Sequence, residues 1–92
     1  MILSFTDKET ERLFRTGRSI RFAGIARKAL RTLDQVERAE AIESLRLPPG
    51  NRLEKLSGDR AGQWSIRIDR QWRVCFEWEN GNASRVEIVD YH

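Results

Sequence analysis

The chain has 92 residues, of which 39% are hydrophobic and 34% charged, with a net charge of +3 at pH 7. This length fits one domain with a modest core and disfavours a large enclosed pocket. The sequence has no apolar run near the roughly 20 residues that a membrane helix needs, no signal-peptide pattern at its start, and one cysteine, Cys75. We therefore expect a single soluble domain over residues 1–92 that works in the cytoplasm, without a membrane.

The first half of the chain predicts a short strand followed by two helices. Residues 2–6 have an extended pattern. Asp7 is a good N-cap and Gly17 a natural stop for a helix over about 8–16. Apolar residues at 3.6-residue spacing then predict a longer amphipathic helix from about 22 to 45.

The second half predicts a sheet. After a Pro-Pro-Gly-Asn break, alternating apolar and polar residues predict strands at 52–56, 64–69, 72–78 and 84–90. Turn signals between the last three strands favour an antiparallel meander. The expected fold is α+β, with two N-terminal helices packed on the apolar face of a mainly antiparallel twisted sheet in the order β-α-α-β-β-β-β. The opposite face would carry arginines, namely Arg67, Arg73 and Arg85.

Basic residues gather in the helical half of the chain. Between Arg12 and Arg31 there are seven basic residues and no acidic one, and arginine outnumbers lysine fourteen to three overall. Arginine can bind phosphate or carboxylate through two parallel hydrogen bonds and can stack on bases. Nucleic acid, an acidic protein partner and a solvated helix face are all consistent with this run.

The candidate acid–base residues are the last three, Asp90, Tyr91 and His92. A ribonuclease that works without a metal needs a base for the 2′-hydroxyl, an acid for the departing 5′-oxygen and cations for the phosphorane. These side chains and a nearby arginine can fill those roles. Structural roles remain open, because a terminal histidine can be a solvated tail, Tyr91 can anchor the strand end and Asp90 can pair with an arginine.

Further cations surround the expected arginine-bearing face. We predict RNA contacts for four of them: Lys55, Arg60, Arg67 and Arg70. The sequence lacks metal-ligand spacing, a phosphate-binding glycine loop and a dinucleotide motif, so neither a metal nor a cofactor is expected.

Several segments in combination resemble the HigB toxins, the plasmid-maintenance killer proteins of the RelE superfamily. They are PPGNRLEKLSGDR at 48–60, GQWSIRI at 62–68, QWRVCF at 71–76 and VEIVDYH at 86–92. With residues 1–5, the resemblance spans almost the whole chain. It implies the RelE-like microbial RNase fold, the toxin role in a type II toxin–antitoxin pair, and cleavage of mRNA in the ribosomal A site.

The resemblance also implies partners and site residues. The partners would be the ribosome, mRNA and a HigA-like antitoxin with a helix-turn-helix domain, which alone would link the toxin to operator DNA. The family's terminal Asp-Tyr-His matches Asp90, Tyr91 and His92, and its central-strand basic residue matches Arg73. Family members commonly carry a lysine where this chain has Ser57. A lysine two residues earlier, Lys55, is a candidate substitute.

Two other functions stay open on the residues alone. A non-catalytic RNA- or ribosome-binding module would use the same arginine-bearing face and inhibit translation by occupancy. A pure interaction protein would instead use the basic helices to bind an acidic partner.

Overall fold

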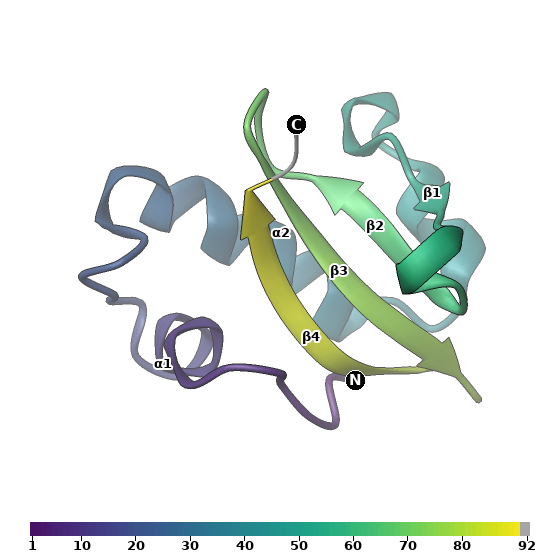
Figure 1. Cartoon of the computed structure of the whole chain (residues 1–92), viewed down its shortest axis with the longest axis horizontal. Helices are drawn as coiled ribbons and strands as arrows, with labels where there is room; N and C mark the ends of the chain where they lie inside the picture. Colours follow the sequence, from purple (N-terminus) through teal and green to yellow (C-terminus); the bar gives the residue numbers. More distant parts are fainter. Residues whose placement is uncertain (91–92) are drawn as a thin grey trace.

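The computed structural model describes residues 1–90, and their fold is α+β, as predicted (Figure 1). The two helices are α1 (Lys8–Thr16) and α2 (Ala26–Arg38). The strands are β1 (Glu54–Lys55), β2 (Gln63–Arg67), β3 (Trp72–Glu79) and β4 (Asn82–Asp90). Neighbouring strands pair antiparallel in the order β1-β2-β3-β4, so the predicted meander is confirmed. Neither helix in this part of the chain is long and apolar enough to cross a membrane.

Helix α1 begins and ends where its capping residues predict. The Asp7 carboxylate accepts hydrogen bonds from the backbone N–H of Thr10 at 2.9 Å and from its hydroxyl at 2.7 Å. Gly17 adopts the left-handed conformation, with φ of 76°, and its N–H reaches the Leu13 carbonyl. The same Thr10 hydroxyl accepts a hydrogen bond from the backbone N–H of Ile88, which fixes α1 to β4.

The prediction of one continuous helix from 22 to 45 is wrong. The helix α2 covers 13 residues, and the chain becomes extended at Ala39, with ψ of 131°. At 1.5 Å per residue this helix already spans about 20 Å, close to the 26 Å width of the domain. Helical periodicity continues beyond both ends because Phe22 and Leu45, 1% and 2% exposed, fill the same core. Phe22 precedes the 3₁₀ segment Ala23–Ile25, and Leu45 lies in the 3₁₀ segment Ile42–Arg46.

The N-terminal segment is also less regular than predicted. Instead of a full strand over 2–6, it forms two isolated parallel bridges to β4, Ile2 with Ala83 and Phe5 with Val86. Between them β4 carries a bulge, where Arg85 has φ of 53°. The bulge interrupts the regular spacing that a continuous ladder requires.

The sheet has one apolar face and one polar face. Apolar side chains of β2, β3 and β4 join those of the helices in the core, among them Ile66, Val74, Phe76, Val86 and Ile88. On the opposite side the register brings together a second set, which we call the arginine face: Ser65, Arg67, Arg73, Cys75 and Glu87. The predicted strand 52–56 shortens to two residues, and Arg52 before it has φ of 47°.

The turn between β2 and β3 is organised by Asp69. Its Oδ1 accepts hydrogen bonds from the backbone N–H groups of Gln71 and Trp72, both at 2.9 Å, and its Oδ2 lies 3.5 Å from the Lys28 ammonium. Burial raises the pKa of Asp69, but these hydrogen bonds and Lys28 together lower it further, so the pKa lies below its ordinary value.

Asp69→Ala should lower the free energy of unfolding at pH 7 by about 1–3 kcal/mol, because two backbone donors lose their acceptor. Asp69→Asn keeps an acceptor and should lose less. Since the folded-state pKa is below the unfolded value, the contribution of the carboxylate is present above the unfolded pKa and is lost as pH falls through the folded pKa. Urea unfolding over a pH series measures this. If the difference in free energy of unfolding between wild type and Asp69→Asn did not become smaller at acidic pH, the assignment would be contradicted.

Candidate functional site

Arg73 is a charged side chain that lies almost wholly inside the sheet, at 6% exposure. Its Nε donates to Ser65 Oγ at 2.9 Å, and its Nη2 donates to the Arg52 carbonyl at 2.7 Å. Nη2 also lies 3.4 Å from Glu54 Oε1. A buried charge needs such partners because its desolvation costs several kcal/mol. Arg73 therefore ties the segment around β1 to the centre of the sheet.

A cavity of about 320 Å³ opens beside Arg73, and we call it the arginine cavity. Its lining residues are Arg52, Glu54, Arg67, Asp69, Arg70 and Arg73. Four guanidinium groups against two carboxylates leave the lining positive. Arg67 and Arg73 are also direct cross-strand partners, where like charges repel each other. The arrangement suits an anion with several acceptor oxygens, such as phosphate.

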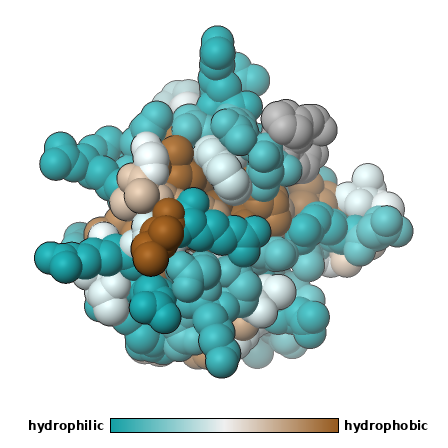
Figure 2. All heavy atoms as spheres, turned by 60° about the vertical axis from the view of Figure 1, so that its left-hand side comes forward, coloured by the Kyte–Doolittle hydropathy of each residue, from teal (hydrophilic) through white to brown (hydrophobic). Residues whose placement is uncertain are grey.

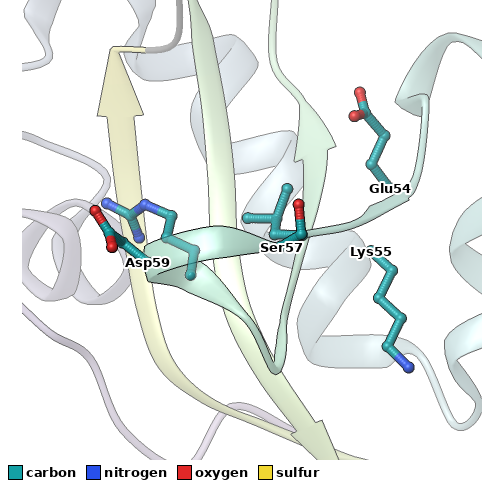
Figure 3. A pocket seen from close by; sticks show the side chains of 6 residues that line it. Glu54, Lys55, Ser57 and Asp59 are labelled. Atoms are coloured by element: carbon teal, nitrogen blue, oxygen red, sulfur yellow. The ribbon is translucent and has the colours of Figure 1, made fainter.

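A second hollow of about 260 Å³ lies along β1 and the following 3₁₀ turn, Gly58–Arg60 (Figure 3). Glu54 lines both this hollow and the arginine cavity. Figure 3 shows the Lys55 side chain directed away from both Glu54 and Ser57. The Lys55 ammonium instead lies 5.7 Å from the ring centroid of Trp64. The Lys55 ammonium therefore does not lie at Ser57. The structure does not support Lys55 as a substitute for the lysine that family members carry at that position.

Arg60 in this turn is held over the arginine face by two acceptors. Its Nη1 lies 3.0 Å from Gln63 Oε1 and 3.1 Å from Glu87 Oε1. Cys75 lies in the same face, between β2 and β4, and burial raises the pKa of its thiol. A buried thiol with a raised pKa is a structural group rather than a nucleophile.

The predicted catalytic residues are only partly within the described range. Asp90 is paired in register with Trp72 and accepts a hydrogen bond from Gln71 Nε2 at 3.0 Å. Arg73 is paired with Val89. Because side chains alternate along a strand, the Asp90 and Arg73 side chains leave the sheet on opposite faces. Tyr91 and His92, the other two predicted catalytic residues, lie outside the described residues.

The four predicted RNA-binding residues divide between the two hollows. Arg67 and Arg70 line the arginine cavity, whereas Lys55 and Arg60 line the second hollow. Arg85, which was expected in the same row of arginines, lies at the β4 bulge, 3.8 Å from Glu77.

Sequence reasoning missed Arg52. Its carbonyl accepts the hydrogen bond from Arg73, and its side chain lines the arginine cavity. The preceding 3₁₀ turn is fixed by Asn51, whose Nδ2 donates to Gln35 Oε1 at 2.7 Å and to the Leu45 carbonyl at 3.1 Å. The sequence feature that could have pointed to Arg52 is the Pro-Pro-Gly-Asn turn directly before it.

Ser65→Ala should lower the free energy of unfolding by about 1–3 kcal/mol, because the buried Arg73 Nε would lose its hydroxyl acceptor. Ser84→Ala in β4 is a matched control, since Ser84 is only half-buried. Urea unfolding of both variants gives the comparison. Equal stability of the two would mean that the Ser65 hydroxyl is not needed to hold Arg73.

Residues 3–92 match the family described as "RelE-like toxin of type II toxin-antitoxin system HigB". The chain is 38% identical over 85 residues to Toxin HigB-1 of Vibrio cholerae serotype O1, covering 90% of each protein. It is 44% identical over 41 residues to Endoribonuclease HigB of Proteus vulgaris, covering 45% of each.

Among solved structures, the YoeB–YefM complex from Staphylococcus aureus contains a similar fold. The alignment has a TM-score of 0.58 at 14% identity, and it covers 100% of this chain and 98% of the other. A likeness at this level of identity concerns the fold alone.

Proposed function

The chain belongs to the HigB-like family of RelE-like toxins of type II toxin–antitoxin systems, and we propose that it is an endoribonuclease that cuts mRNA in the ribosomal A site. The observation that carries the proposal is the arginine cavity, in which four arginines gather on one side of the sheet. The name of the Proteus vulgaris relative, an endoribonuclease, supports the same reaction class.

The proposed chemistry is acid–base catalysis by the chain's own residues. One of Asp90, Tyr91 and His92 accepts the 2′-hydroxyl proton as the 2′-oxygen attacks phosphorus. Another donates a proton to the 5′-oxygen as its bond to phosphorus breaks. Histidine, with an ordinary pKa of about 6.5, suits either step near neutral pH. Arg73 stabilises the phosphorane charge, and the other arginines hold adjoining phosphates.

The shape of the arginine face supports dependence on the ribosome. The hollows on this side are small, about 320 and 260 Å³, and belong to a domain only 30 × 26 × 26 Å in extent. Both hollows are open to solvent, so they can bind phosphates without enclosing a nucleotide. A larger particle that presents one strand of mRNA in a fixed conformation supplies the positioning that this face lacks.

The proposal includes a protein partner, a HigA-like antitoxin with a helix-turn-helix domain. The structurally similar YoeB is recorded in complex with YefM in a toxin–antitoxin assembly. In the proposed system the toxin reaches operator DNA only through its antitoxin.

His92→Ala should slow cleavage of ribosome-bound mRNA about 100-fold or more, through loss of an acid–base group. Arg73→Lys keeps the charge but removes the bidentate guanidinium donor, so we expect the cleavage rate to fall by at least about tenfold. Arg38→Ala on α2 is the control, because Arg38 is exposed and ion-paired to Asp34 rather than part of the arginine face. New mRNA 5′ ends on programmed ribosomes are the readout. Undiminished cutting by both test variants would refute the site assignment.

One observation favours a second candidate, inhibition of translation by occupancy. Ser57 stands where relatives are expected to carry a lysine, Lys55 contacts Trp64, and Arg60 is paired with Glu87. The second hollow therefore offers RNA less positive charge than a lysine at position 57 would provide. Translation arrest without new mRNA 5′ ends would support this candidate over cleavage.

Ser57→Lys should accordingly raise the cleavage rate, by about tenfold or more, because a well-placed cation stabilises the transition state. Ser44→Lys, in the 3₁₀ segment after α2, adds the same charge away from the arginine face and serves as the control. Rates are compared on the same programmed ribosomes. An unchanged rate for Ser57→Lys would show that the hollow beside β1 does not contact the reacting phosphate.

A further inference from the structure

A groove lies between α1 and α2, on the helical side of the molecule. It has a volume of about 480 Å³ and is lined by Phe14, Arg27, Leu30, Arg31 and Asp34, and we call it the helix groove. Phe14 and Leu30 are half-buried, so both present apolar surface to solvent, and Phe14 also packs against the core. Figure 2 shows hydrophobic atoms recessed between hydrophilic side chains on the side of the molecule that it presents. The connection between the helices adds Ile20, at 97% exposure.

Four of the seven basic residues between Arg12 and Arg31 form no ion pair within residues 1–90, and two of these four, Arg27 and Arg31, line the helix groove. Several cations between Arg12 and Arg31 are ion-paired, such as Arg15 with Glu11 at 2.8 Å and Lys28 with Asp69 at 3.5 Å. Within residues 1–90, Arg27 and Arg31 are exposed and form no ion pair. Asp34, the one carboxylate of the groove lining, is held by Arg38 at 3.1 Å. The groove thus combines an apolar floor with two uncompensated arginines.

We propose that the helix groove is the docking site for an acidic amphipathic segment of the antitoxin. Apolar side chains of that segment would cover Phe14 and Leu30, and its carboxylates would pair with Arg27 and Arg31. Burial of apolar surface with opposite charges at the rim is the usual composition of a specific protein interface. The inference rests on the proposed function insofar as it takes the partner to be an antitoxin.

The occupant is a protein rather than RNA for two reasons. A nucleic-acid backbone would bring only sugars and phosphates to the groove and would leave the exposed apolar surface of Phe14 and Leu30 without apolar contacts. The molecule also offers phosphate a denser group of cations in the arginine cavity, on the other side of the sheet. The two surfaces share no lining residue, so substitutions can separate their roles.

The test uses the full chain and its antitoxin, with the affinity of the complex measured by calorimetry. The double variant Arg27→Glu with Arg31→Glu should raise Kd at least about tenfold, because attraction becomes repulsion. Leu30→Ala should raise Kd without any change of charge. The control is Arg46→Glu with Arg85→Glu, which makes the same charge change at exposed positions that neither line the groove nor contact its lining residues. Thermal unfolding verifies that each variant is folded.

Three outcomes would overturn the proposal. Affinities within twofold of wild type for both groove variants would place the antitoxin elsewhere. An equal rise in Kd for the control variant would show that the effect depends on net charge alone. Loss of ribosome binding by the groove double variant, with antitoxin affinity retained, would assign the groove to RNA. Cleavage of ribosome-bound mRNA is measured separately, so absence of cleavage would refute the proposed enzyme activity without altering the binding result.

Discussion

The buried guanidinium of Arg73 is the constraint around which the polar side of this domain is built. A charge at this depth is tolerated only if fixed acceptors surround it, and here they come from β2, from the Arg52 carbonyl and from Glu54. Meeting that requirement draws an irregular loop against the sheet and brings Arg52 to the arginine cavity. The same bonds that stabilise the charge therefore also shape the surface that RNA is proposed to contact. A cation held this way is preorganised, since it needs no rearrangement when an anion arrives.

The two sides of the sheet differ in what they can recognise. The arginine face concentrates cations with little apolar surface between them, which suits phosphate groups. The helical side intersperses cations with acids and half-buried apolar residues, which suits a protein segment. A domain of 92 residues can carry both surfaces because its sheet is a single layer, with the helices on one side and the other side left free for the arginine face.

Much of the fold follows from local signals in the sequence. Asp7 and Gly17 fix the ends of α1, and period-two alternation gives the faces of β2, β3 and β4 correctly. The prediction of the second helix failed because periodicity records which residues reach the core and not which backbone conformation brings them there. Phe22 and Leu45 reach it from outside α2. The short β1 was overestimated because the left-handed Arg52 depends on a turn that is anchored by Gln35, far away in the chain.

The site could be predicted only in part, for related reasons. Arg67, Arg70 and Arg73 follow from strand alternation and the intervening turn, and they do share one cavity. The pairing of Arg60 with Glu87 and the stacking of Lys55 on Trp64 are contacts between separate elements. Nothing in the local sequence indicates whether a charged side chain is free to bind a ligand or already occupied by a neighbour.

The N-terminal segment beside β4 has a consequence for how this protein meets others. The backbone N–H groups of Ala83, Arg85, Val86 and Ile88 are occupied by Met1, Ser4 and Thr10, so little of this edge can accept another strand. At the other edge of the sheet, β1 is two residues long and both of them, Glu54 and Lys55, are charged. Short, charged or covered edges resist the edge-to-edge pairing that leads to aggregation. The two edges of the described sheet thus offer few backbone groups for strand addition, which favours recognition of this protein through its side chains.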